Sequence, residues 1–262
     1  MNPAEKPARH LLRLTVLIAV LPLLLIGLGA IGAKFGWWGW KFGFVTLTVK
    51  AGAGLAFVAL ISGLVALYVA AFAGFRRLWP LAVLSLAVPL LMVAAFASVR
   101  GTAKRFPGHD IATDWEQPLA FSPRLMAARG PDANPVHPDP RSVWNNPNVE
   151  NWTDRRAEAV NRDLCPAAQA VTLPVAPAEA YRRVKAAAAD AGFEVVTDDP
   201  AAGVLEATDK TFWFAFKDDV AFRVRPQGQG SRIDLRSVSR VGRSDLGKNC
   251  SRVSGLAKAL RG

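Results

Sequence analysis

The sequence predicts an α+β domain that is attached to a membrane by three transmembrane helices. The first hundred residues contain three apolar runs, and each run has the ~20 residues that a helix needs to cross a bilayer. The last hundred residues contain short runs with the alternation of β-strands and two segments with the apolar spacing of helices. A proline-rich stretch lies between these regions. We therefore expect three parts, a transmembrane region at 1–99, a wrapping linker at 100–166 and an α+β domain at 167–262.

The three predicted membrane helices cover about residues 14–33, 48–75 and 78–99. Apart from Lys50 at the start of the second run, no charged side chain lies inside them. Since ion and proton pathways need polar groups within the membrane, transport is not expected. The first run follows a basic segment and is longer than the apolar part of a signal peptide, so we expect it to stay as an anchor.

The positive charge of the chain is concentrated beside these runs. Residues 1–99 carry eight basic and one acidic residue, a net +7, whereas residues 100–262 carry 24 basic and 20 acidic residues, a net +4. This distribution is typical of loops that flank membrane helices, so no nucleic-acid partner is expected. The pair Arg76 and Arg77 in a very short loop favours a cytoplasmic position for that loop. We therefore expect a protein of the bacterial inner (plasma) membrane with a cytoplasmic N-terminus and a periplasmic C-terminal domain.

The loop between the first two runs is rich in aromatic residues. It reads KFGWWGWKFGF over residues 34–44 and contains three tryptophans beside two lysines. Amphipathic rings of this kind prefer the interface between membrane and water. The sequence therefore predicts an interfacial anchor, and an aromatic platform for a ligand is the alternative.

The stretch 100–166 holds nine of the eighteen prolines, which predicts an extended, irregular backbone. Trp115, Trp144 and Trp152 are unusual for a disordered tether, which is poor in aromatic residues. We expect this stretch to wrap against the folded domain and to form one short helix at about 153–163.

The segment from 167 onward has a regular pattern. A helix is predicted at 177–191, where Pro177 suits the first turn, and a second helix is predicted from about Leu246, with Ser244 or Asp245 as its N-cap. The predicted strands cover residues 168–175, 193–197, 203–208, 212–216, 220–224 and 232–238. The most economical packing is an antiparallel sheet with both helices on one face, a two-layer sandwich of the helix-grip kind.

The last two strands predict their own register. If Arg225 faces Arg232 in a hairpin closed by 226–231, then Phe222 faces Leu235 and one face of the hairpin is fully apolar.

Charged residues then share the opposite face of this hairpin. Asp219 falls diagonally between Arg236 and Arg240, and Arg243 lies near the start of the last helix. One interpretation is a lattice of salt bridges on the outer face of the sheet. The alternative is an anion site, because several guanidinium groups on one face can bind a phosphate or carboxylate head group.

Asp218 falls on the apolar side of the same hairpin, where a carboxylate needs hydrogen-bond partners or a raised pKa. One interpretation is a buried polar network that fixes the turn into the last helix. The alternative is a catalytic carboxylate that works with His109 and Asp245. The residues that can hydrogen bond to Asp218 are Ser239, Ser244 and Asn249.

The two cysteines, Cys165 and Cys250, both lie in the C-terminal region. An even pair in an exported domain forms a disulfide in many proteins, and two buried thiols are the alternative. The three histidines lie at no metal-ligand spacing from one another or from the cysteines. We expect neither a metal nor a cofactor.

The charged tract also carries a resemblance. The run FKDDV at 216–220, the run RSVSRVGRSDLG at 236–247 and the following Asn249 resemble the signature of the uncharacterised domain-of-unknown-function family 1499. The upstream segment 107–114 is similar to the corresponding segment of membrane-attached members. The resemblance covers about residues 107–262 and implies no catalytic residues, since the family has no established activity.

We therefore expect an integral membrane protein whose external α+β domain is a binding or interaction module rather than an enzyme. No G-x-S-x-G, P-loop or G-x-G-x-x-G signature is present. The expected partners are the lipid bilayer, an anionic small molecule or lipid head group, and another membrane protein. One alternative is a membrane-bound hydrolase that uses Asp218 and His109, and another is a structural subunit of a membrane complex. The predicted ligand-binding residues are Asp219, Arg236, Ser239, Arg240, Arg243, Ser244 and Asn249.

Overall fold

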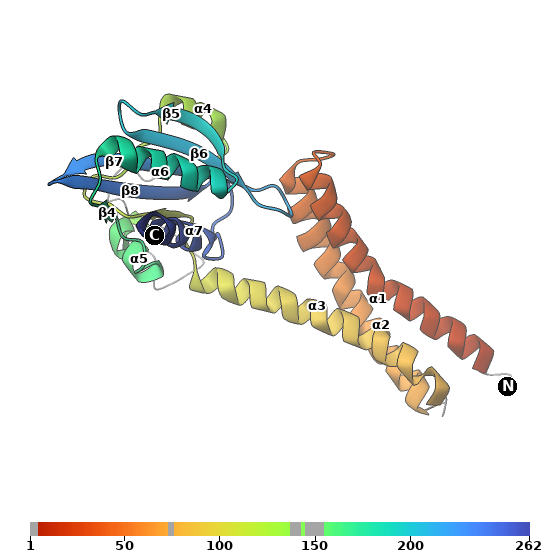
Figure 1. Ribbon diagram of the computed structural model, residues 1–262. Coiled ribbons are helices and arrows are strands. Elements are labelled where there is room, and N and C mark those ends of the chain that lie inside the picture. Colours follow the sequence, from red (N-terminus) through yellow and green to blue (C-terminus); the bar gives the residue numbers. More distant parts are fainter. Residues whose placement is uncertain (1–4, 73–75, 137–142, 145–154) are drawn as a thin grey trace. The chain divides into compact units, whose positions relative to one another are not determined.

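The computed structural model of the protein describes residues 5–72, 76–136, 143–144 and 155–262 (Figure 1). The chain forms two compact units. The first consists of residues 1–101 and 212–215, and the second consists of residues 102–211 and 216–262.

The first unit is built from three long apolar helical segments. These are α1 (Glu5–Lys34), the π-helical η1 (Lys41–Gly52) continuing into α2 (Ala53–Phe72), and the single turn η2 (Arg76–Leu78) continuing into α3 (Trp79–Arg105). Each segment is long and apolar enough to cross a bilayer, and most of their large apolar side chains point outward. The three predicted membrane helices are therefore confirmed as helices that can span a membrane.

Small residues let these helices approach closely. A Cβ atom added at Gly63 would lie 2.5 Å from the backbone oxygen of Ser85, so α2 and α3 touch where only a glycine fits. The hydroxyl groups of Thr15 and Ser85 also lie 2.8 Å apart and join α1 to α3.

The second unit is a six-stranded antiparallel sheet with helices, which confirms the α+β class. The strands follow the order β1-β8-β7-β6-β5, and β4 pairs with the same edge of β8 as β1. The strands of this sheet are β1 (Asp110–Ala112), β4 (Val171–Leu173), β5 (Glu194–Asp199), β6 (Val204–Lys210), β7 (Lys217–Gln227) and β8 (Gly230–Ser239). The helices are α4 (Pro123–Arg129), α5 (Ala157–Leu164), α6 (Pro177–Asp190) and α7 (Lys248–Arg261), and a small separate ribbon pairs β2 (Val143–Trp144) with β3 (Arg155–Arg156).

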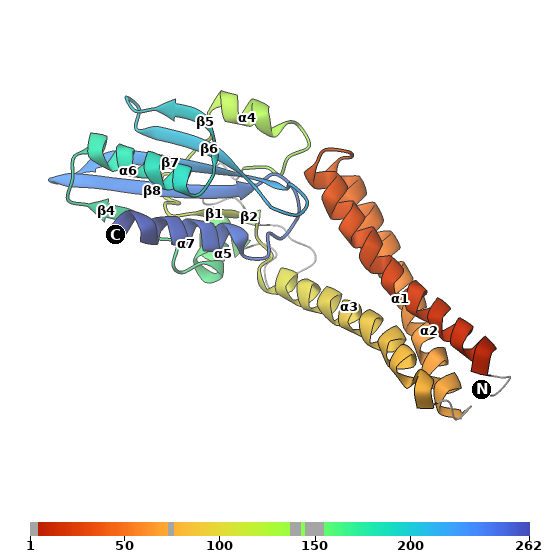
Figure 2. The same cartoon turned by 45° about the vertical axis from the view of Figure 1, so that its right-hand side comes forward.

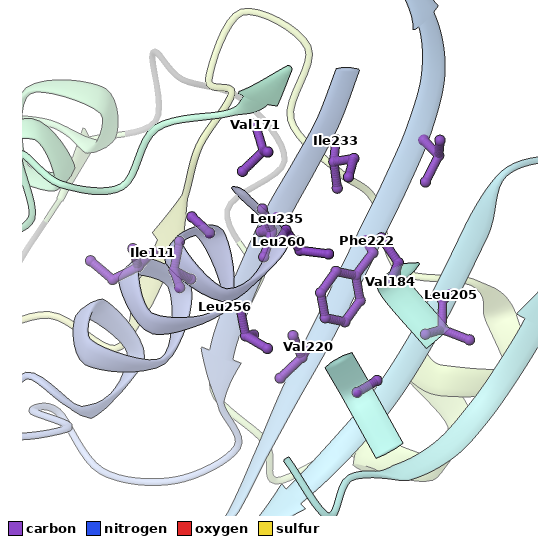
Figure 3. Close-up of a cluster of buried hydrophobic side chains, with 14 of the residues drawn as sticks. Ile111, Val171, Val184, Leu205, Val220, Phe222, Ile233, Leu235, Leu256 and Leu260 are labelled. Atoms are coloured by element: carbon purple, nitrogen blue, oxygen red, sulfur yellow. The ribbon is translucent and has the colours of Figure 1, made fainter. Parts of the chain in front are cut away.

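The main core lies between one face of the sheet and the helices α6 and α7 (Figures 1 and 3). Phe222 and Leu235 come from the sheet, while Val184 of α6 and Leu256 of α7 close over them. These side chains are almost fully buried, and burial of each stabilises the fold by roughly 1.5–3 kcal/mol.

The register predicted for the last hairpin is confirmed. Phe222 pairs with Leu235, and Arg225 pairs with Arg232. The turn is tighter than expected, because the strands continue to Gln227 and Gly230 and leave two residues between them. The first of the two is a glycine with φ of 58°, the left-handed conformation that such a turn requires.

The strand predicted at 212–216 is wrong, since these residues belong to the connection between β6 and β7. The two strands already pair at Lys210 and Lys217, so the residues between them must reverse the chain. Ala215 adopts a φ of 51°, outside the extended region. Aromatic residues favour strands, yet a hairpin connection has no neighbouring strand with which to pair.

The stretch 100–166 supplies β1, α4 and α5 rather than a tether, and its described part covers the outer face of the sheet. Leu119, Phe121 and Leu125 pack on Ala221 and Val238 of β7 and β8. The expectation that helices cover only one face of the sheet is therefore wrong. The apolar side chains of this segment are buried against the second face. α5 occupies most of the predicted helix 153–163, whose first two residues lie outside the described part of the chain.

Candidate functional site

Asp219 is the centre of a buried ion-pair cluster on the covered outer face. Its side chain is fully buried and accepts hydrogen bonds from Arg129 at 2.6 Å, from Arg240 at 2.7 and 2.9 Å, and from Thr208 at 2.8 Å. Arg129 comes from the end of α4, and Arg240 follows β8. The covering segment and the sheet are therefore joined by charged groups as well as by apolar packing.

Arg236 makes a second buried pair on the same face. Its guanidinium group donates to both carboxylate oxygens of Asp110, at 3.0 and 2.6 Å, and to the backbone oxygen of Leu119 at 2.7 Å. Its charged carbon also lies 5.2 Å from the ring centroid of Trp115. Two of the three guanidinium groups predicted for an anion site, those of Arg236 and Arg240, thus already bind the protein's own carboxylates. We call the pairs around Asp219 and Arg236 the covered cluster.

A different polar network lies on the helix side of the sheet. Asp209 of β6 and Asp218 of β7 face each other across the ladder, where two like charges repel. One nitrogen of Arg252, from α7, resolves this conflict, because it lies 2.6 Å from Asp209 and 2.7 Å from Asp218. The carboxylate of Asp218 is thereby held in an ion pair.

Asn249, one turn before Arg252 on α7, connects the network to the end of β8. Its amide nitrogen donates to the hydroxyl of Ser239 at 2.9 Å and to the backbone oxygen of His109 at 3.0 Å. Its side-chain oxygen accepts from Ser237 and Arg252, both at 2.6 Å. We call this set, which joins Asp209, Asp218, Ser237, Ser239, Asn249 and Arg252, the helix-side network.

The N-cap of α7 is Gly247, so the prediction of Ser244 or Asp245 at this position is wrong. Asp245 lies two residues before the N-cap and binds the start of the helix from there. Its carboxylate accepts hydrogen bonds from the backbone nitrogens of Gly247 at 2.7 Å and Asn249 at 2.9 Å. Burial of this carboxyl, and to a lesser degree the nearby charge of Asp218, raises the pKa of Asp245 above its usual range.

The other two predicted site residues lie in the same loop before α7. The hydroxyl of Ser244 donates to the backbone oxygen of Phe106 at 2.5 Å, and Arg243 is exposed to solvent. The structure therefore brings Asp218, Ser239, Asn249 and the backbone of His109 together, whereas Asp219, Arg236 and Arg240 belong to the covered cluster.

The helix-side network borders a groove between α6 and α7 with a volume of about 660 Å³, a size within the usual range of ligand sites. Alanines and leucines of the two helices line much of it, with Phe193 beyond the end of α6. Asp209 and Arg252 of the network form part of the wall. The other charged or polar groups of the groove are Arg183, Asp190, Lys248 and Ser251.

A disulfide joins Cys165 to Cys250 beside the core, with Cα atoms 5.5 Å apart. It ties the end of α5 to the first turn of α7. The helix that carries the network and one wall of the groove is thus held covalently.

The sequence model of the family described as protein of unknown function DUF1499 matches residues 110–260, more than half of the chain. The chain belongs to this family. The DUF1499 domain therefore includes the covered cluster, the whole helix-side network and every groove residue except Gly262. No curated protein matches the chain.

Sequence reasoning missed Arg252 and Asp209, the two residues that connect the network to the groove. A signal for Arg252 was its position three residues after Asn249 and next to Val253, on the inward stripe of an amphipathic helix. Asp209 could have been found from the sheet register, because a carboxylate opposite Asp218 requires a cation between them.

The raised pKa of Asp245 predicts a dependence of stability on pH. The folded state binds the carboxyl proton of Asp245 more tightly than the unfolded state does. The stabilisation of the folded state by this proton is fully present below the ordinary aspartate pKa of ~3.9, and it is lost as pH rises through the pKa of Asp245 in the folded state. We expect Asp245→Asn, which keeps an acceptor oxygen, to remove this component. Urea unfolding of both proteins from pH 4 to 8 gives the test. As pH rises, the free energy of unfolding of the wild type should fall steadily relative to that of the variant. A difference in unfolding free energy that stays constant with pH would contradict the prediction.

Proposed function

We propose that the DUF1499 domain is a membrane-anchored binding module for an amphiphilic ligand with an apolar chain and an anionic head group, such as a lipid or a fatty acid. The observation that carries this proposal is the composition of the groove between α6 and α7. Its small apolar side chains suit an acyl chain, and Lys248 at the start of α7 suits an acidic head group.

The polar end of the groove favours side-chain recognition of that head group. Asp245 already binds the backbone nitrogens of Gly247 and Asn249, so these amides are occupied. Lys248 is exposed and, within the described residues, forms no salt bridge. Its ammonium group is therefore available to an anion, with the hydroxyl of Ser251 on the same wall.

The proposal includes a compartment. We infer that the protein lies in the bacterial inner membrane with the N-terminus in the cytoplasm and the DUF1499 domain in the periplasm. The disulfide between Cys165 and Cys250 supports an oxidising compartment for this domain, and the Arg76 and Arg77 pair supports a cytoplasmic loop between the second and third helices.

The test fills the groove at Gly255. A Cβ atom added there meets nothing within 4 Å, and the residue lines the groove in the middle of α7. Gly255→Trp is expected to keep the fold and to abolish retention of the ligand. The full chain is purified from membranes into a mild detergent, and native mass spectrometry compares the bound mass before and after denaturation.

Ala189→Trp is the matched control. Ala189 is exposed on α6 but does not line the groove, so this variant adds the same side chain outside the site. We expect it to retain ligand like the wild type. Equal ligand retention by both variants would contradict a site in the groove, and an absence of bound mass in the wild type with added oleate or phosphatidylglycerol would contradict the proposed ligand class.

A further inference from the structure

The connection between β6 and β7 carries three consecutive aromatic residues, the exposed Phe212 and Trp213 and the half-buried Phe214, which we call the aromatic tip. Phe212 is 66% exposed and Trp213 is 63% exposed. Their rings meet edge to face at a centroid distance of 5.0 Å, so they present one apolar surface. An exposed apolar cluster of this kind is uncommon unless it contacts another surface.

The aromatic tip is a built feature of the hairpin. The backbone nitrogen of Thr211 donates to the oxygen of Phe216 at 2.8 Å, and the nitrogen of Phe216 donates to the hydroxyl of Thr211 at 3.0 Å. These bonds close the connection at its base. Two exposed lysines, Lys210 and Lys217, pair across the strands directly before and after it. Aromatic rings flanked by lysines have the composition of segments that lie at a membrane surface.

The base of the tip lies at the end of the domain where the chain arrives from α3. The backbone oxygen of Lys217 accepts from the nitrogen of Arg240, in the loop that precedes α7. The same loop is bound to the first residues after α3, because Ser244 donates to Phe106 and the nitrogen of Asp245 donates to the oxygen of Gly108 at 3.0 Å. Figure 2 shows the start of β7 and the start of α7 at the same end of the sheet.

We propose that the aromatic tip inserts into the lipid–water interface of the bilayer. The chain leaves the third membrane helix with Lys104 and Arg105, and the residues that follow bind the loop that also binds the base of the tip. The tip offers the interface its rings, and the exposed Lys217 at its base faces the acidic head groups, whereas Lys210 pairs with Glu194. No conformational change is needed for Phe212 and Trp213, since their rings are already exposed.

One consequence rests on the proposed function. The groove is lined in part by Asp209 and Arg252, and Asp209 lies three residues before the tip. Insertion of the tip therefore places the polar end of the groove close to the lipid, from which an amphiphile can enter.

The test uses a spin label at position 213. The native cysteines are joined in a disulfide, so Trp213→Cys supplies a single thiol for the label. The labelled full chain is reconstituted into liposomes of phosphatidylcholine and phosphatidylglycerol, and collisions of the label with oxygen, which prefers lipid, and with a water-soluble nickel complex are measured. We expect high exposure to oxygen and several-fold lower exposure to nickel than for a label at Gln229→Cys, in the turn between β7 and β8.

Two outcomes overturn the proposal. Equal exposure of both labels to nickel would mean that the tip lies in water. Protection of the label at 213 from both nickel and oxygen would mean that a protein surface covers it. Trp213→Ser separates insertion of the tip from ligand binding in the groove. This variant keeps every groove residue and is expected to retain ligand in the mass spectrometry test.

Discussion

Replacement of Asp219 by alanine is expected to destabilise the DUF1499 domain by about 3–5 kcal/mol, the range found when one partner of a buried ion pair is removed. The variant leaves the guanidinium groups of Arg129 and Arg240 buried without their carboxylate. It also removes four hydrogen bonds that join α4, β6 and the end of β8 to β7. Urea unfolding of the full chain in detergent, followed by circular dichroism, measures the change.

The control is an ion pair on the surface. Glu158→Ala breaks the exposed pair with Arg162 within α5 and is expected to change the unfolding free energy by less than about 1 kcal/mol. If Asp219→Ala does not fold, the milder Asp219→Asn should fold with an intermediate loss, because its amide oxygen can still accept from one arginine. A loss for Asp219→Ala no larger than that for Glu158→Ala would show that the covered cluster contributes little to stability.

Loss of the disulfide is expected to have an effect of similar size. The bridge joins residues that are 85 positions apart, and closing a loop of this length stabilises a fold by about 4.5 kcal/mol in the chain-entropy model. Cys165→Ala combined with Cys250→Ala should therefore shift the urea midpoint strongly downward. Wild type with a reducing agent should shift to a similar midpoint.

The double variant is also the control for the reagent. A reducing agent should leave its midpoint unchanged, because no disulfide remains in it. If reduction lowered both midpoints equally, the effect would be due to the reagent. If it lowered neither, the bridge would not stabilise the domain.

Much of the fold follows from local patterns. The apolar runs of the first unit, the stripe on α7 and the alternation around Phe222 and Leu235 each repeat with the period of one element. The segment 212–216 is the exception. Its aromatic residues fit the composition of a strand, and only the pairing of Lys210 with Lys217 shows that they form a connection.

The candidate site was predictable in part. The hairpin register places Asp218 on the helix side and Asp219 on the outer side, and both positions are as predicted. Their main partners come from other elements, since Arg252 belongs to α7 and Arg129 to α4, which lies about 90 residues earlier in the chain. A register within one hairpin holds no information about such distant segments.

Hydrophobic period and run length are local properties, so they were enough to predict three helices able to span a membrane and an α+β domain of the DUF1499 family. Only the packed chain shows that Arg236 and Arg240 bind the protein's own carboxylates under a covering segment, and that α6 and α7 leave a groove beside Arg252. The environment of a charged side chain depends on which distant segments exclude water from it. That exclusion arises only when the whole chain is packed.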